Sequence, residues 1–357
     1  MNLPEKTVLQ ARPERVGDSY RIAIVGAGSL KGKEVAEVLN DRNFPSRDVK
    51  LLDDDESLGQ LENVGEEVTF IQKVRAEEFR NLDFTFFASN PECTKKNWIA
   101  ARDAGSDIID LSYALEDEPS VTIRSPWIER QLGQTPVVEL QPGPVVIAHP
   151  AAVVLSLLTL RLQKAGTLQR LTTTVFEPAS EHGQKGMDEL HQQTVNLLSF
   201  QQLPKNVFDI QVAFNLVTRY GEQSSPALST IEKRILRHYR SLAGKDAPAL
   251  SLMLVQAPIF HGHAFSVHVE FNGPVDMEKI SQALAGDHVE LIAGPEEAPN
   301  NVSAAGQPDV QVCVKNDVNQ PNSIWLWAAT DNLRVAASTA VECAETMAVN
   351  RPRGKVQ

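Results

Sequence analysis

The chain has 357 residues and a formal charge of −12, from 34 basic and 46 acidic side chains. Its length exceeds what one ordinary hydrophobic core contains, so we expect two domains. Because no basic tract is long enough to follow a phosphate backbone, nucleic acid is not an expected partner. Residues 151–160 form the longest apolar run, which is too short to span a bilayer, so no membrane is expected either.

The first residues carry charges and no apolar signal segment, so we interpret residues 1–19 as a flexible tail on a cytoplasmic protein. A short apolar run at 20–26 then ends at glycine, which is typical of a buried parallel strand. After a turn at 26–32, apolar residues recur at helical spacing over 33–39, and a second strand at 49–52 follows. This order predicts a right-handed βαβ unit of the dinucleotide-binding type.

The turn between the first strand and the helix has the features of a pyrophosphate site. Glycine lets the backbone approach the ligand, and the unpaired N–H groups of a helix N-terminus favour an anion. Asp53 follows Gly32 by 21 positions, which suits a hydrogen bond from an adenosine ribose. The glycine spacing differs from the common G-x-G-x-x-G, so a tight turn without a ligand stays an alternative. The candidate cofactor-binding residues of this unit are Gly26, Gly28, Ser29, Leu30, Gly32 and Asp53.

Acidic residues gather at the end of the second strand, where Asp53, Asp54, Asp55 and Glu56 follow one another. If partly desolvated, they would repel a ribose 2′-phosphate by several kcal/mol. We therefore expect NAD rather than NADP, if a dinucleotide binds at all. A solvated acidic turn with no role in binding is the alternative.

Further strands at residues 84–88 and 108–111, with an amphipathic helix at 95–104 between them, continue the alternation. It predicts an α/β fold with a doubly wound, Rossmann-type sheet over residues 20–148. A mixed pattern follows, and it predicts an α+β domain over residues 149–330 that could carry both a site and a dimer surface. The helices of that domain are expected at 153–162, 186–198 and 229–242, and its strands at 171–176, 250–258 and 264–271.

Six segments carry a family resemblance; in chain order they are IAIVGAGSLKGKEVAEVLNDRNFP, DIIDLSYAL, SEHGQKGMDELHQQTVNLL, AFNLV, VQAPIFHGHAFSVHVEF and ATDNLRVAASTAVECAE. Together they resemble the aspartate-semialdehyde dehydrogenase family of amino-acid biosynthesis over nearly the whole chain, most closely its divergent Usg-like branch. The resemblance implies that residues 331–357 form a helix that returns to the Rossmann domain and brings Asn332 to the cofactor. It also implies that the central domain pairs into a homodimer, with a tetramer as the alternative.

In that family a cysteine thiolate attacks the substrate carbonyl, a histidine acts as acid/base and a nicotinamide exchanges hydride. The resemblance places the nucleophile position at Ala151, or at Ala152 if the helix register slips by one. A methyl group cannot attack a carbonyl, and such a loss lowers the rate by a factor on the order of 10⁴ to 10⁶. The acid/base position falls at His263, for which a plain hydrogen bond at a strand end is the alternative.

The substrate-pocket positions implied by the resemblance have changed as well. The family's phosphate-binding arginine falls at Glu116, its substrate-binding arginine at Gln256, and a glutamine at Glu177. Glu232 matches a family carboxylate, whereas the family's lysine is absent, with Leu228 the nearest match. Because aspartyl phosphate and aspartate semialdehyde carry negative charge, these exchanges disfavour them as ligands.

His149, His182 and His261 could line the same pocket, but their spacing is not diagnostic of a metal site, and we predict none. Cys93 lies in NPECT, which looks like the family's nucleophile motif but occurs much earlier in the chain. It is either a relocated nucleophile or a semi-buried loop thiol. Cys313 is interpreted as a packing residue, like the remaining Cys343.

Three functional hypotheses follow. The first is a catalytically silent dimer, a pseudoenzyme that keeps a nucleotide-binding fold and acts by binding. The second is an NAD(P)-dependent oxidoreductase acting on a different aldehyde or carbonyl by direct hydride transfer, with His263 as proton donor. The third is conventional family activity through Cys93.

Overall fold

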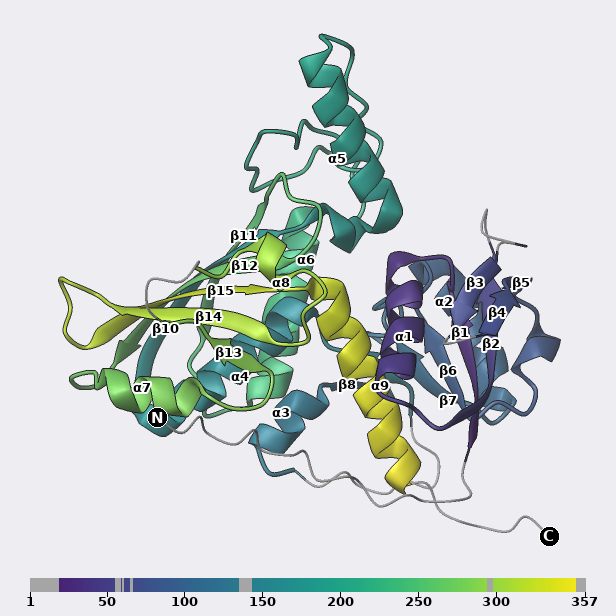
Figure 1. Ribbon diagram of the computed structural model, residues 1–357, viewed down its shortest axis with the longest axis horizontal. Helices are drawn as coiled ribbons and strands as arrows, with labels where there is room; N and C mark the ends of the chain where they lie inside the picture. Colours follow the sequence, from purple (N-terminus) through teal and green to yellow (C-terminus); the bar gives the residue numbers. More distant parts are fainter. Residues whose placement is uncertain are drawn as a thin grey trace, which may run out of the picture.

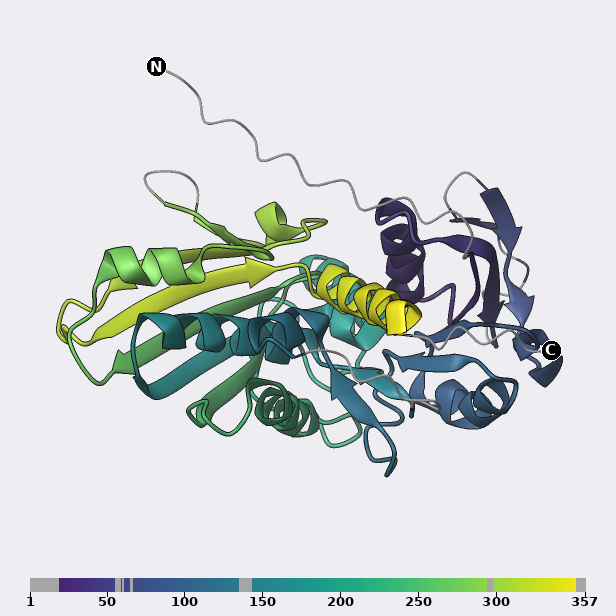
Figure 2. The ribbon, with the colours of Figure 1, turned by 90° about the horizontal axis from the view of Figure 1, so that it is seen from below.

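The computed structural model describes residues 19–54, 59, 61–64, 67–134, 143–293 and 298–350. These residues form two large sheets, and Figures 1 and 2 both show the C-terminal helix α9 (Asn332–Asn350) lying between them. Every helix within these ranges is too short or too polar to serve as a membrane span.

The first sheet has seven strands, all paired in parallel, in the spatial order β5-β2-β1-β6-β7-β9-β8. Its strands are β1 (Tyr20–Val25), β2 (Ser46–Asp53), β5 (Gln72–Lys73), β6 (Phe84–Phe87), β7 (Asp107–Asp110), β8 (Thr122–Arg124) and β9 (Val145–Ile147). The connections hold the helices α1 (Leu30–Asp41), α2 (Pro91–Asp103) and α3 (Pro126–Gln131), the 3-10 helix η1 (Ala76–Phe79), and the antiparallel pair β3 (Leu61–Val64) and β4 (Glu67–Phe70).

Both faces of the first sheet are covered, which explains why its strands β1, β6 and β9 are largely apolar without alternation. On one face, Val38 of α1 and Ala340 of α9 belong to the same hydrophobic cluster. On the other face, Phe79 of η1 and Trp98 of α2 pack against Val25 of β1. The helix from the end of the chain therefore completes the core of the domain that begins it.

The second sheet is mixed and has six strands in the order β11-β10-β12-β15-β14-β13. Its strands are β10 (Leu168–Glu177), β11 (Leu250–Gln256), β12 (His263–Phe271), β13 (Val289–Leu291), β14 (Val310–Asn316) and β15 (Ser323–Thr330). Its helices are α4 (Pro150–Ala165), η2 (Ala179–His182), α5 (Gly183–Leu198), α6 (Leu228–Ala243), α7 (Met277–Leu284) and α8 (Asn301–Ala304).

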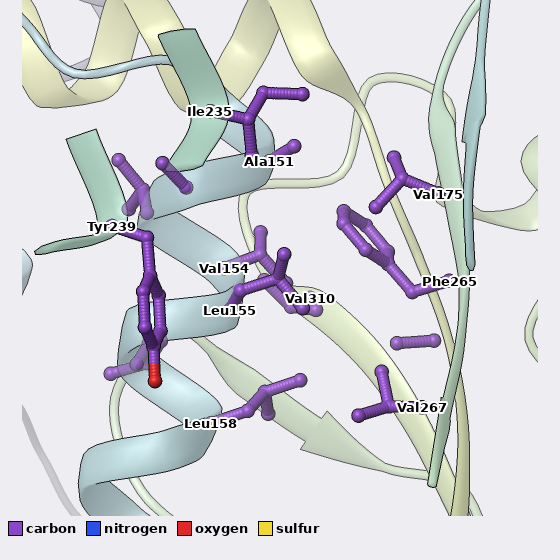
Figure 3. Packing of buried hydrophobic residues seen from close by; sticks show 14 of the residues in the cluster. Ala151, Val154, Leu155, Leu158, Val175, Ile235, Tyr239, Phe265, Val267 and Val310 are labelled. Atoms are coloured by element: carbon purple, nitrogen blue, oxygen red, sulfur yellow. The ribbon is translucent and has the colours of Figure 1, made fainter. Parts of the chain in front are cut away.

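Helix α4 is the centre of the second core. Its sequence PAAVVLSLLTLRLQKA is apolar around most of its circumference, and such a helix must be enclosed. Figure 3 shows Leu155 and Leu158 of α4 facing Phe265 and Val267 of β12, all within one cluster. The parallel first sheet, the mixed second sheet and the returning C-terminal helix confirm the predicted α/β fold class.

Two glycines fix the turn between β1 and α1. Gly26 has φ +83°, and a Cβ there would lie 2.5 Å from the backbone of Ser89. A Cβ on Gly32 would lie 2.1 Å from the carbonyl oxygen of Gly26. The chain's own packing therefore requires both glycines, whether or not a ligand sits above the turn.

We expect Gly32→Ala to destabilise the protein by about 1–3 kcal/mol, because the added methyl group meets rigid backbone atoms. Gly273→Ala is the matched control, since nothing lies within 4 Å of a Cβ built at Gly273. The comparison of urea midpoints tests this expectation. Equal midpoints for the two variants would show that the turn is not as tightly packed as described.

Candidate functional site

Strand pairing brings the predicted acid/base together with one predicted pocket residue. His263 begins β12 and Glu177 ends β10, and these antiparallel neighbours are in register at Phe176 and Ala264. His263 Nε2 lies 2.9 Å from Glu177 Oε2, and both side chains are fully buried. Burial raises the pKa of Glu177, and the hydrogen bond with His263 partly opposes this effect.

His149 approaches this pair from the first residue before α4. Its Nδ1 accepts the N–H of Ala151 at 3.2 Å, which caps the helix, and its ring centroid is 5.5 Å from that of His263. Burial lowers the pKa of His149 well below its usual value, so the ring is neutral near pH 7. The side chain is 1% exposed, and it is therefore held in place by its surroundings.

Ala151 and Ala152 are fully buried in the first turn of α4. Figure 3 shows Ala151 beside Ile235 of α6 within the apolar cluster. Both candidate positions for the family's nucleophile thus carry a methyl group, and neither offers a nucleophilic atom.

Cys93 lies elsewhere, in the first turn of α2 in the first domain, where it is 2% exposed. Its backbone N–H donates to the side chain of Asn90, the residue that caps the helix. Burial raises the pKa of the Cys93 thiol to about 11, so the reactive thiolate is scarce near neutral pH. These surroundings are those of a packing residue.

A carboxylate from the second domain meets a lysine from the first. Lys31 Nζ in α1 lies 3.6 Å from Glu181 Oε2 in η2. Asn332 donates from Nδ2 to Glu181 Oε1 at 2.8 Å and accepts the N–H of Gly262 at 3.0 Å through Oδ1. Burial opposes ionisation of Glu181, but the charge of Lys31, the neighbouring histidines and the hydrogen bond from Asn332 together lower its pKa below the usual range. Asn332, which was predicted to bind the cofactor, joins η2 to the start of β12.

Glu116 stands where the family has an arginine, and its negative charge is neutralised by Arg234. Arg234 of α6 forms a two-nitrogen ion pair with Glu116, with Nη2 2.9 Å from Oε1, and His238 Nε2 lies 3.3 Å from Oε2. Burial opposes the effect, but the hydrogen bonds from His238 and Arg234 lower the pKa of Glu116 to about 2. The ring of Tyr113 lies between Lys31 and Arg234, 4.7 and 4.6 Å from their charged groups.

Gln256, at the other arginine position, has its hydrogen bonds satisfied within the protein. Its Nε2 donates to the carbonyls of Glu177 and Ala257 at 3.0 and 2.8 Å. Its Oε1 accepts the hydroxyl of Tyr220 at 2.6 Å, and this hydroxyl also lies 2.9 Å from His182 Nε2. Burial lowers the pKa of His182 to about 4, so no positive charge replaces the missing arginine.

Two other candidates lie outside this group. Glu232 accepts the N–H of Leu254 at 3.0 Å, so its carboxylate contacts the edge of β11. The carbonyl oxygen of His261 accepts a hydrogen bond from Nδ2 of Asn301 at 3.2 Å.

The predicted cofactor turn is built as a helix N-terminus. Ser29 caps α1 by accepting the N–H of Gly32 at 2.9 Å. The carboxylate of Asp53 accepts the N–H of Gly28 at 3.0 Å. The first turn of α1, which starts at Leu30, contains Lys31 and no acidic residue. A helix N-terminus without acidic residues favours an anion such as a diphosphate, whereas the charge of Lys31 is already paired with Glu181.

The rest of the acidic cluster is described only in part. Asp54 donates its N–H to Asp53 Oδ1 at 2.9 Å. Asp55 and Glu56 lie outside the described residues.

Sequence patterns missed four residues of this junction: Lys31, Tyr113, Arg234 and His238. A signal existed for the last two, since they are four residues apart on a helix and therefore share a face. The contacts of Lys31 and Tyr113 depend on how the two domains meet, which no local pattern reports.

Comparison with known proteins agrees with this architecture. Residues 21–135 match the family model "Semialdehyde dehydrogenase, NAD binding domain", and residues 157–335 match "Semialdehyde dehydrogenase, dimerisation domain". The aspartate-semialdehyde dehydrogenase of Rickettsia bellii is 29% identical over 92% of this chain and 97% of its own length. A USG-1 protein homolog of Pseudomonas aeruginosa is 31% identical over 89% of this chain and 94% of its own length.

Solved structures give the same result. A probable aspartate-semialdehyde dehydrogenase from Pseudomonas aeruginosa superposes with a TM-score of 0.82 at 29% identity, covering 93% of this chain and 99% of that one. Aspartate-semialdehyde dehydrogenase II from Vibrio cholerae gives 0.81 at 25% identity, with the same coverage. The resemblance seen in the sequence, including its Usg-like character, is confirmed: the chain belongs to the semialdehyde dehydrogenase family.

Proposed function

We propose that this protein has lost normal aspartate-semialdehyde dehydrogenase activity and acts as a nucleotide-binding homodimer. The observation that carries the proposal is the first turn of α4, where Ala151 and Ala152 are fully buried methyl groups. Sulfur combines nucleophilicity near neutral pH with good leaving-group ability, and no other side chain replaces it in acyl transfer to phosphate. Cys93 is not a substitute, because its burial keeps it protonated.

The charges around the pocket support the same proposal. The guanidinium of Arg234 lies at the family's phosphate position, but the carboxylate of Glu116 pairs with it through its Nε and Nη2. Lys31 is likewise paired with Glu181. An anionic substrate would have to displace a partly or largely buried carboxylate from either cation, which is less favourable than meeting an unpaired arginine.

With aspartate semialdehyde, phosphate and NADP, we expect the pure protein to turn over on the order of 10⁴- to 10⁶-fold more slowly than active family members. Ala151→Cys and Ala152→Cys, made singly, should each fail to restore a normal rate, because Glu116 and Gln256 remain. NADPH formation at 340 nm is the measurement. A wild-type kcat within the ordinary enzyme range, about 1–10³ s⁻¹, would remove this proposal.

We propose NAD rather than NADP as the nucleotide. The bound cofactor would supply a hydride acceptor or donor, and Gly28, Ser29 and Leu30 would approach its diphosphate. Asp53 ends β2 and Asp54 follows it, the region that faces the adenosine ribose in dinucleotide-binding folds, and neither residue offers a cation for a 2′-phosphate.

In a thermal-shift titration, NAD should raise the melting temperature at lower concentrations than NADP. Binding to the folded state alone stabilises a protein by about 2.7 kcal/mol at a hundredfold excess over Kd. Adenosine monophosphate serves as the control for adenosine binding alone. Equal or greater stabilisation by NADP would contradict the argument from Asp53 and Asp54.

Dimerisation is expected to use the second domain, and the part of it that projects furthest is apolar. Figure 1 shows α5 extending away from both sheets. Large apolar side chains on α5 and the segment after it are exposed: Val195, Leu198, Phe200, Phe214 and Leu216. Such a patch is typical of an interaction surface. A tetramer would need a second surface of this kind.

None of the three cysteines forms a disulfide, which agrees with a proposed cytoplasmic location.

The buried pair of Glu177 and His263 favours a second candidate, an oxidoreductase that acts on another carbonyl by direct hydride transfer. Glu177 at 2.9 Å orients the imidazole of His263, and an oriented imidazole can pass a proton to a carbonyl oxygen. No thiol is required for such a reaction.

This second candidate makes a distinct prediction. In a screen of aldehydes and ketones with NADH, any activity found should be abolished by His263→Ala and unaffected by Ala151→Cys. Loss of His263 removes the proton donor, whereas a new thiol takes no part in direct hydride transfer. Activity that survives His263→Ala would rule out this role for the histidine.

A further inference from the structure

Three potential metal ligands meet at the candidate site. His149, Glu177 and His263 each offer one ligand atom, these atoms all lie within 4.8 Å of one another, and the three residues are buried. They come from three separate elements: the cap of α4, the end of β10 and the start of β12. Tertiary structure alone brings them together.

Two polar atoms of this group lack hydrogen-bond partners. Glu177 Oε1 and His263 Nδ1 are enclosed and have none among the described residues. Buried polar atoms in native proteins are nearly always paired, so these two atoms show that the protein alone does not satisfy all the hydrogen-bonding capacity of the two side chains. Both atoms are of types that bind metal ions.

We propose that His149, Glu177 and His263 bind one divalent transition-metal ion of the zinc class. Two imidazoles and one carboxylate form a common three-ligand set for such ions, with further positions open to water or a ligand. The proposal goes beyond the loss of thiol chemistry and does not depend on it.

The charges near the three residues favour a dication. Glu177 and Glu181 contribute two carboxylates, and His149 Nε2 lies 3.9 Å from Glu181 Oε2. Lys31 forms an ion pair with Glu181, at 3.6 Å. Arg234 is paired with Glu116.

Coordination requires two local changes. The hydrogen bond between His263 Nε2 and Glu177 Oε2 must open so that both atoms face the ion. His149 Nδ1 must release the N–H of Ala151, because coordination through Nδ1 uses its lone pair, and coordination through Nε2 places the proton on Nδ1. Metal–nitrogen bonds of about 2.0–2.1 Å put ligand atoms about 3.4 Å apart, so His149 must approach the other two residues.

A bound ion and the acid–base role of the second candidate exclude each other. A ring nitrogen of His263 that coordinates the ion cannot at the same moment hand a proton to a carbonyl. The metal-bound form therefore agrees with the proposed binding protein, and failure of the metal proposal leaves the loss of thiol chemistry untouched.

The test is a Co²⁺ titration of the full-length, tag-free protein after treatment with a chelator. We expect one Co²⁺ per chain, visible absorption bands of a site with few ligands, and displacement by Zn²⁺ but not by Mg²⁺, which prefers oxygen ligands. His149→Ala, Glu177→Gln and His263→Ala should each weaken binding by more than about 100-fold. His191→Ala should not, since His191 is exposed on α5.

Binding that is unchanged in all three ligand variants, or no binding by folded wild-type protein, would overturn the proposal. Circular dichroism establishes whether each variant is folded. Should a variant not fold, X-ray absorption at the zinc edge of the wild-type protein decides the question. Two imidazoles and an oxygen ligand support the site, and a sulfur ligand contradicts it.

Discussion

A carboxylate enclosed by protein must have a charged or hydrogen-bonding partner, and this constraint organises the junction of the two domains. Glu181 of the second domain takes its partner, Lys31, from the first. Glu342 of α9 is 3% exposed and is paired with Arg42 at the end of α1 and Arg130 of α3, at 3.2 and 2.7 Å. The orientation of the domains is therefore tied to the pairing of buried charges as well as to apolar packing.

The same constraint changes how the pocket's substitutions are understood. Sequence comparison suggests that Glu116 repels an anionic ligand, because it replaces an arginine. In the folded protein, Arg234 neutralises this carboxylate, and the pKa of about 2 keeps the pair ionised across the physiological range. The position is therefore closed to an anion by an internal ion pair, rather than by an exposed negative charge.

Much of the fold could be predicted because its signals are local. The glycine turn, the apolar strand before it and the helix after it come from one short segment, although α1 begins at Leu30, earlier than the helix predicted over 33–39. The strand at 323–330 was not predicted, although SIWLWAAT is rich in β-branched and aromatic residues. Its pairing with β12 on one side and β14 on the other is a long-range property.

The candidate site likewise has some features that the sequence reveals and others that depend on tertiary structure. His263 and Glu177 could be identified by resemblance, but their contact depends on the register between β10 and β12. His149 could be named as a pocket residue, whereas its capping role follows from where α4 begins. Tyr113 adopts φ +63°, which is unusual for a residue other than glycine, and no sequence pattern anticipates such a backbone.

Helix α9 comes late in the chain but packs on its earliest elements, because its residues fill the core that covers one face of the first sheet (Figure 1). During synthesis the ribosome delivers β1 and α1 first and α9 last. One side of the nascent first sheet must therefore wait, with apolar residues uncovered, until almost the entire chain has emerged. The first domain is therefore translated first but completed last, and its uncovered apolar face is accessible to chaperones during that interval.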